Sequence, residues 1–119
     1  MDEQRAKQIA ALNDQFRLKF FVPTFGPRPV PGHIVCTRGI SALPPHSQIC
    51  IWSAVSEFSS FAEDDDPYGE HDFVNIEHDG EEYFAKLDYY APDMQGGSED
   101  PSDPSTTVRV LTIMRADEY

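Results

Sequence analysis

The chain has 119 residues, 39% hydrophobic and 12% aromatic, which fits one globular domain and excludes a disordered chain. Its formal net charge of −12 argues against direct nucleic-acid binding, which needs clustered lysine and arginine. No apolar run is long enough for a signal peptide or a membrane span. Cys36 and Cys50 are too few for a disulfide framework and indicate reduced thiols. We therefore expect one cytoplasmic domain, residues 1–119, without a cofactor.

The first predicted elements are a helix over residues 2–19 and a proline-rich connector over residues 21–32. The connector holds four prolines and two glycines in twelve residues, which excludes a regular helix or a central strand. The helix is indicated by apolar side chains spaced three or four positions apart, namely Ile9, Leu12, Phe16 and Phe20.

A short strand over residues 33–38 and a second helix follow. Proline is tolerated in the first turn of a helix, so Pro44-Pro45 indicates where the second helix begins. The acidic run at residues 63–66 comes after it and ends with Pro67. The apolar stripe of this helix is predicted at Ile49, Trp52, Val55 and Phe58.

Residues 71–78 and 81–90 are predicted to form a β-hairpin, because Asp79-Gly80 suits both positions of a type I′ turn. If these two residues are the loop, the register follows by counting, and one face of the pair is apolar. The expected pairs are His78–Glu81, Glu77–Glu82, Ile76–Tyr83, Asn75–Phe84, Val74–Ala85, Phe73–Lys86, Asp72–Leu87 and His71–Asp88.

The remaining chain is predicted to be a long polar loop over residues 91–106 and a strand over residues 107–114, apolar enough to be central. The element order predicts an α+β fold with two helices packed on a mostly antiparallel four-stranded sheet with a central β-hairpin. The predicted core residues are Ile9, Leu12, Ile49, Trp52, Val74, Ile76, Leu87, Val110 and Ile113.

The expected pair His71–Asp88 is the sharpest candidate for catalysis. A carboxylate opposite a histidine can fix its tautomer and raise its basicity, as a general base requires. Lys86, on the same predicted face, could stabilise a developing negative charge. The structural alternative is a polar cross-strand pair that holds the register, and no serine or cysteine nucleophile has an evident place beside it.

A divalent metal site is a second hypothesis. The ligand types are present, but His71 and His78 would point to opposite faces of a regular strand. No recognised metal-binding spacing occurs, so no metal is predicted. The possible ligands are Asp66, Glu70, His71, Asp72, His78 and Asp88.

The acidic surface is the third hypothesis. Sixteen of the 21 acidic residues lie between positions 57 and 103, where Lys86 is the only basic residue. An array of carboxylates can imitate a nucleic-acid backbone and occupy a basic groove of another protein, and the alternative is a surface that is merely solvated. The predicted partner-binding residues are Glu63, Asp64, Asp65, Asp66, Glu70, Glu77, Glu81 and Glu82.

The segments IVCTRGISALPP, DPYGEHDF, YFAKLDYY and SEDPSDPSTTVRVLTIMRADEY resemble a family of small bacterial proteins known only as a domain of unknown function. The resemblance runs from Leu12 to Tyr119 and brings no activity with it. Family members often occur on plasmids and other mobile elements, which implies a role in gene transfer or counter-defence. The characteristic positions of the family fall on residues 66–73 and on Lys86, Asp88, Tyr89 and Tyr90.

From these observations we predict a non-catalytic, acidic interaction protein that engages a basic protein, with no direct contact to nucleic acid or membrane. A nucleic-acid mimic that inhibits a host defence or regulatory factor is one form of this hypothesis. The alternative is a small hydrolase that uses His71, Asp88 and Lys86, with or without a divalent metal.

Overall fold

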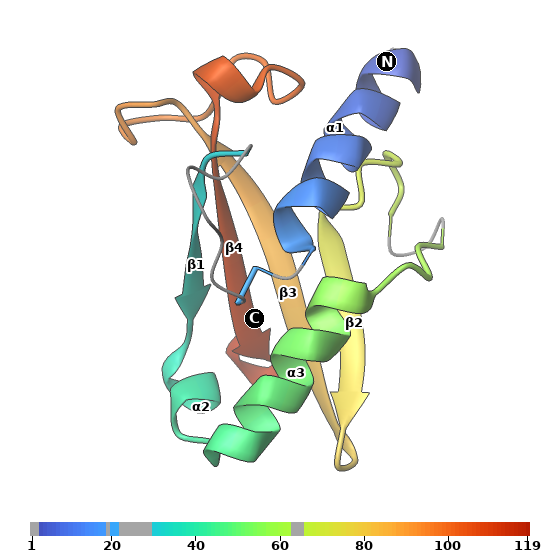
Figure 1. The fold of residues 1–119 in the computed structure, drawn as a ribbon, viewed down its shortest axis with the longest axis vertical. Helices are drawn as coiled ribbons and strands as arrows, with labels where there is room; N and C mark the ends of the chain where they lie inside the picture. Colours follow the sequence, from blue (N-terminus) through green and yellow to red (C-terminus); the bar gives the residue numbers. More distant parts are fainter. Residues whose placement is uncertain (1–2, 19, 22–29, 63–65) are drawn as a thin grey trace.

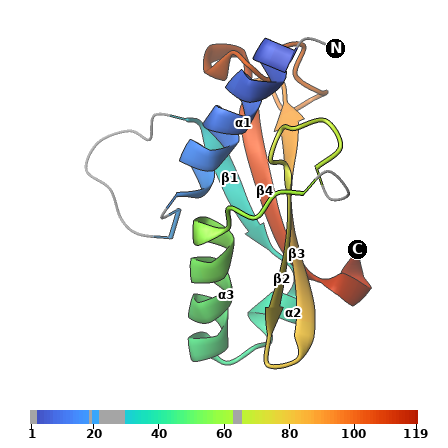
Figure 2. The same ribbon diagram turned by 90° about the vertical axis from the view of Figure 1, so that its right-hand side faces the viewer.

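The structure is a computed structural model that describes residues 3–18, 20–21, 30–62 and 66–119. It contains a four-stranded sheet with the strand order β1-β4-β3-β2 (Figure 1). Helices α1 and α3 cover one face of this sheet, and the C-terminal turn projects from the other (Figure 2). The class is therefore α+β, and the site is built where α1, α3 and the sheet meet. No helix in the described ranges is long and apolar enough to cross a membrane.

Helix α1 spans Glu3–Arg17, with Glu3 in its first turn and Arg17 in its last, where each charge opposes the helix dipole. The predicted end at residue 19 lies outside the described residues. Two polar side chains, Asn13 and Arg17, lie on the buried stripe together with Ile9 and Phe16. This helix therefore contributes hydrogen-bonding groups, as well as apolar area, to the interior.

The connector lies largely outside the described residues, which resume at Val30 before β1, Gly32–Cys36. The predicted strand to residue 38 is too long, because a short helix, α2, occupies Arg38–Ser41. The carboxylate of Glu118 accepts the Gly39 N–H at 3.0 Å, which helps to fix this turn. The described elements thus include three helices rather than the expected two.

Helix α3 spans Pro45–Glu57 and has proline in its first turn, as predicted. Its buried apolar face is formed by Ile51 and Val55, both fully buried, whereas Ile49 is 51% exposed. The prediction of Ile49 as a core residue was wrong, because a spacing of three or four fits either stripe of an all-round apolar helix. Packing of α3 against β2 decides which stripe is buried.

Strands β2, Phe73–His78, and β3, Glu81–Tyr90, are antiparallel. Their six residue pairs, from Phe73–Lys86 to His78–Glu81, are those counted from the sequence. Asp79 and Gly80 between them have φ of 51° and 80°, the left-handed backbone that this turn requires. Because β2 is an edge strand, however, the pair does not form the centre of the sheet.

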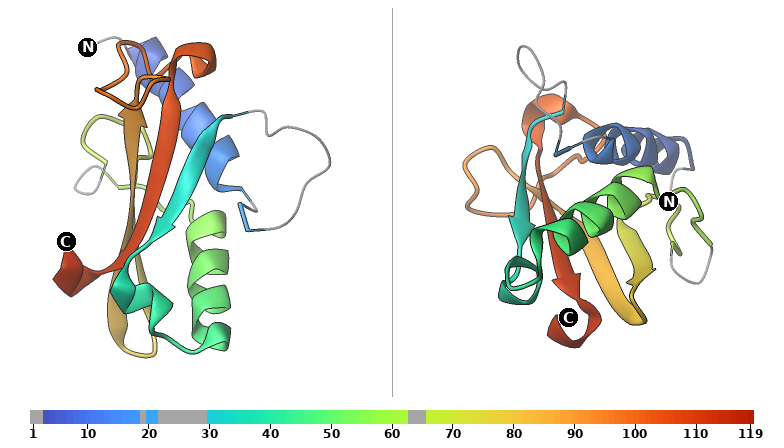
Figure 3. Two further views of the ribbon diagram at one scale, coloured as in Figure 1. Left: turned by 90° about the vertical axis from the view of Figure 1, so that its left-hand side faces the viewer. Right: turned by 60° about the horizontal axis from the view of Figure 1, so that its bottom comes forward.

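Strand β4, Val108–Arg115, is central, as predicted, and lies between β1 and β3 (Figure 3). It is antiparallel to β3 but parallel to β1, so the sheet is mixed and the prediction of a mostly antiparallel sheet was wrong. Leu111 and Ile113 are buried, whereas Val110 points to the opposite face, because alternate residues of a strand face opposite ways.

The other predicted core residues are either buried or partly buried. The segment 91–106, predicted to be a polar loop, contains some regular structure. Ile9, Val74 and Leu87 are buried, whereas Leu12, Trp52 and Ile76 are partly buried and pack against the core. A bridge from Tyr90 to Gly97 and a short 3-10 helix at Pro104–Thr106 organise the segment after β3.

Candidate functional site

The loop that precedes β2 is shaped by the buried carboxylate of Asp66, which is 7% exposed. Its Oδ1 accepts the backbone N–H of Glu70 at 3.0 Å and of His71 at 3.1 Å. His71 has a φ of 57°, a left-handed conformation that a histidine adopts only when its surroundings hold it there. The loop therefore turns at His71, before the strand starts at Phe73.

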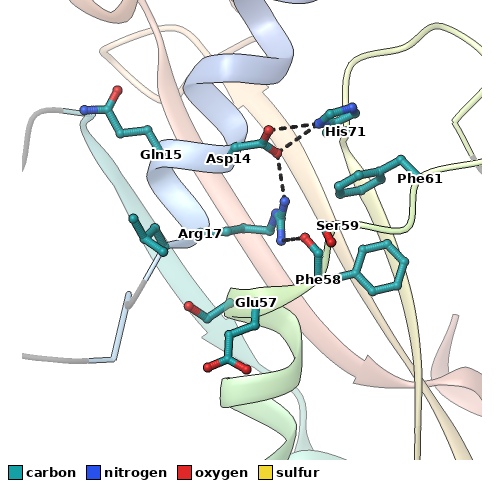
Figure 4. A pocket seen from close by; sticks show the side chains of 10 residues that line it. Asp14, Gln15, Arg17, Glu57, Phe58, Ser59, Phe61 and His71 are labelled. Atoms are coloured by element: carbon teal, nitrogen blue, oxygen red, sulfur yellow. Dashed lines mark hydrogen bonds and ion pairs between the residues drawn. The ribbon is translucent and has the colours of Figure 1, made fainter.

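The imidazole of His71 is held from several directions (Figure 4). Its Nδ1 lies 2.9 Å from Oδ1 of Asp14, and its ring stacks on Phe61 with centroids 4.0 Å apart and planes 3° from parallel. Its Nε2 lies 3.8 Å from Oδ2 of Asp66. Both ring nitrogens therefore face carboxylates, and the histidine links α1 to the loop.

The predicted pairing of His71 with Asp88 was wrong. The left-handed backbone at His71 takes its side chain out of the strand register and toward α1. Asp88 forms its ion pair with Lys86, 3.3 Å away on the same strand. A general base needs a ring nitrogen directed at its substrate, and this arrangement directs Nε2 toward a buried carboxylate. The three residues of the hydrolase hypothesis thus do not form one constellation.

Beside His71 lies a cavity of about 570 Å³, framed by α1 and the end of α3. Arg17 borders it and is 2% exposed. Its Nη1 donates to the carbonyl oxygens of Val55 at 2.7 Å and Phe58 at 3.1 Å, and its Nη2 donates to Asp14 at 2.8 Å. Burial lowers the pKa of Arg17, and Asp14 opposes this shift. The guanidinium therefore satisfies carbonyls at the end of α3 and fastens α1 to it.

Arg109 of β4 is a second arginine in the interior, and it is fully buried. Its Nε donates to Oδ1 of Asn13 at 2.6 Å and its Nη2 to the carbonyl oxygen of Pro101 at 2.7 Å. The Asn13 amide donates in turn to the Tyr89 hydroxyl at 2.8 Å, and that hydroxyl donates to Glu70 at 3.0 Å. Burial raises the pKa of Tyr89, with a further contribution from Glu70. These residues form one polar network inside the molecule.

The sequence reasoning missed the whole of this network and the role of Asp14. A pattern search treats Asn13, Asp14 and Arg17 as the solvent side of an amphipathic helix, and arginine is almost never fully buried unless paired. The available signal was positional. Asn13 and Arg17 are four residues apart on the same stripe as Ile9 and Phe16, so a helix that buries the apolar pair buries the polar pair too.

The eight predicted partner-binding carboxylates separate into three groups. Glu63, Asp64 and Asp65 lie outside the described residues. Asp66 is buried and Glu70 is half-buried and hydrogen-bonded to Tyr89, so these two serve the interior. The exposed ones are Glu77, Glu81 and Glu82, which surround the β2–β3 turn together with Asp79.

A metal centre is not formed by the described part of the chain, where no three histidine, cysteine, aspartate or glutamate side chains converge to hold an ion. His71 lies before β2, whereas His78 is the last residue of that strand. Both cysteines are free, and burial raises the pKa of the Cys36 thiol. A raised thiol pKa lowers the thiolate fraction that a nucleophile needs.

Residues 36–118 match the family described as protein of unknown function (DUF3768). The chain belongs to this family. The match begins at Cys36, within β1, so it is narrower than the resemblance to Leu12 suggested, and α1 precedes it. Within the matched part lie His71 and Arg109, whereas their partners Asp14 and Asn13 come from the segment before it. No curated protein and no solved structure matches the chain.

Proposed function

We propose that this protein binds a basic protein partner through the exposed carboxylates around the β2–β3 turn, Glu77, Asp79, Glu81 and Glu82. The observation that carries the proposal is the direct cross-strand pairing of Glu77 with Glu82. Like charges directly opposite each other destabilise a sheet, whereas opposite charges at such a pair stabilise it. The pair therefore lowers the stability of the free protein, and a cationic surface of a partner would neutralise the two charges and remove their repulsion.

The distribution of the basic residues supports the same proposal. The formal net charge of −12 counts Arg17 and Arg109, which are both buried, and Arg17 is already paired with Asp14. Three other cations are already engaged with carboxylates, Arg5 with Asp100, Lys86 with Asp88, and Arg115 with Asp117 and, at 3.9 Å, with Glu81. These cations are therefore occupied within the protein, and its strongly negative net charge favours fast association with a basic protein.

The more specific form of the proposal is a nucleic-acid mimic. A basic groove that binds a phosphate backbone releases counterions on binding, and a carboxylate array can release them in the same way. The mimic would act in the cytoplasm of a bacterial host, on a nucleic-acid-binding factor of defence or regulation. Carriage of the gene on mobile elements would fit such a counter-defence role.

The test is a pull-down from bacterial lysate with the tagged protein, washed at low and then high salt and read by mass spectrometry. The proposal predicts one strongly basic protein, released by high salt and reduced at least tenfold with the bait E77Q/E81Q/E82Q. The matched control E3Q/E57Q/E99Q removes the same charge from exposed positions elsewhere and should retain the partner. Equal loss with both baits would reduce the interaction to net charge, and capture unaffected by either would refute the proposal.

A further inference from the structure

A second, smaller hollow of about 340 Å³ lies between the loop before β2 and the C-terminal turn. It is separate from the cavity beside His71 and has a different lining. Its walls include the aromatic side chains of Tyr68, Phe73 and Tyr119, together with the charged side chains of Asp72, Lys86 and Asp88. Phe73, Lys86 and Asp88 place it on the face of the sheet opposite α1 and α3.

The aromatic side chains of the hollow pack against neighbouring rings on one side and are open to solvent on the other. The Phe73 ring packs on Phe84 with centroids 5.0 Å apart, and Tyr119 meets both rings edge to face at 6.0 and 5.7 Å. Tyr119 is nevertheless 76% exposed, and Tyr68 is 65% exposed. Two large aromatic side chains thus border the hollow with much of their surface uncovered, and aromatic faces attract cations.

The charges in this hollow are unbalanced. Lys86 is engaged with Asp88 at 3.3 Å, and within the described ranges no lysine or arginine forms an ion pair with Asp72. Burial raises the pKa of Asp72, and the neighbouring carboxylates of Glu70, Asp66 and Asp88 add to the shift. A carboxylate in a partly buried position, repelled by its neighbours, gains from a cation delivered by another molecule.

We infer that this hollow receives a cationic side chain of the basic partner, an arginine whose guanidinium lies against the tyrosine rings and binds the Asp72 carboxylate. Arginine fits better than lysine because its planar fork stacks on aromatic faces and pairs with carboxylates through two hydrogen bonds. The inference rests on the proposed function and deepens it. The exposed carboxylates of the turn attract the partner, and the hollow selects one side chain.

The test is an NMR titration of the isotope-labelled protein with N-acetyl-arginine-N-methylamide, a probe that carries one guanidinium and no other charge. The neutral isostere with citrulline in place of arginine is the matched control probe. We expect the arginine probe to shift the amides of Asp72, Phe73 and Tyr119, and the citrulline probe to bind at least tenfold more weakly. Asp72→Asn should reduce the affinity for the arginine probe about tenfold, and Tyr119→Ala should reduce it severalfold.

Three results would overturn the inference: equal binding of both probes, shifts spread over all acidic segments, or unchanged affinity in Asp72→Asn. A lysine probe that binds more tightly than arginine would overturn the choice of side chain. E77Q/E81Q/E82Q should bind the arginine probe as the parent does, because the turn lies at the other end of β2 from Asp72. Loss of the partner with this variant, but no probe binding to the parent, refutes the hollow and leaves the proposed function standing. Probe binding to the parent without recovery of any basic partner supports the hollow as an arginine site and refutes the proposed function.

Discussion

Two groups of carboxylates in this protein have opposite environments. Asp14, Asp66 and Glu70 lie where α1 meets the loop before β2, and each accepts hydrogen bonds from the protein. Glu77 and Glu82 lie beside the β2–β3 turn, exposed and facing each other across the strands. The first group holds the fold together, because each charge has partners, whereas the second weakens it slightly and remains available to another molecule.

Charge density alone therefore does not locate an interaction surface. Asp66 ends the densest acidic run of the chain, yet it is buried and accepts hydrogen bonds from backbone N–H groups. Glu82 belongs to a sparser run, yet its carboxylate is exposed. A carboxylate is available to a partner when the protein itself does not supply its hydrogen-bond donors. The path of the backbone determines whether such donors lie nearby.

The largest effect should come from breaking the first region at Asn13. Asn13→Ala removes the acceptor of Arg109 Nε and the donor to the Tyr89 hydroxyl, and leaves a buried guanidinium under-bonded. We expect a loss of about 3 kcal/mol in the free energy of unfolding, measured by urea denaturation. The matched control Asn75→Ala, at an exposed position of β2, should change it by less than about 0.5 kcal/mol. Similar losses in both variants would contradict the network.

A smaller effect is expected from Asp66, the carboxylate that shapes the loop. Asp66→Ala leaves the N–H groups of Glu70 and His71 without their acceptor and should cost about 2 kcal/mol. Asp66→Asn keeps an oxygen at that position and should cost clearly less. Thermal unfolding of the two variants side by side measures the difference. If the two substitutions cost the same, the charge of Asp66 matters and its hydrogen bonds do not.

The second region should respond in the opposite direction. Glu82→Lys places an ammonium opposite Glu77 and should stabilise the protein by up to about 1 kcal/mol while it weakens binding of the basic partner. The gain should disappear in a Glu77→Gln background, which makes a double-mutant cycle the appropriate measurement. Glu99→Lys, an equal charge change at an exposed position elsewhere, is the control. A destabilising Glu82→Lys would show that the pair is not repulsive.

The smallest effect concerns Asp72, which is neither buried like Asp66 nor exposed like Glu82. Because its pKa is raised in the folded state by burial and by Glu70, the folded protein binds the proton more tightly than the unfolded chain. Stability should therefore fall as the pH rises from the ordinary aspartate value of 3.8 through the raised pKa, and then level off. Asp72→Asn should remove this part of the fall, so it should be slightly stabilising at neutral pH and neutral at low pH. Urea denaturation across that pH range measures it, and a variant less stable at neutral pH would contradict the sign.

The parts of the fold that depend on local chemistry could be predicted from the sequence. The register of β2 and β3 follows from the two left-handed positions at Asp79-Gly80, and the central place of β4 follows from its apolar run. The direction of β1 could not be predicted, because a five-residue apolar strand pairs in either direction and its partner is distant in the chain. The buried face of α3 could not be predicted either, because a spacing of three or four fits more than one stripe of this apolar helix.

The candidate site was only partly predictable. The sequence pointed to His71 and to the acidic segment around it, but the pairing depended on a regular strand up to residue 71. One left-handed residue redirected the histidine from Asp88 to Asp14, and backbone strain of this kind leaves no trace in a pattern of residue types. Burial of Arg109 could not be predicted because its partners are a backbone carbonyl and an asparagine, which carry no charge pattern. For Arg17 the only signal was its place on the stripe of Ile9 and Phe16.

The position of β4 also has a consequence for how the chain assembles. Both β1 and β3 pair with β4, which follows every other strand in the sequence, and Gly32 is aligned with Arg109. During synthesis β1 therefore has no strand to pair with until β4 has emerged, while β2 and β3 can already pair with each other. Contacts between such distant segments slow folding, so we expect a late, slow phase in refolding in which β1 gains amide protection with β4. Pulsed hydrogen exchange would show this order, and early protection of β1 would exclude it.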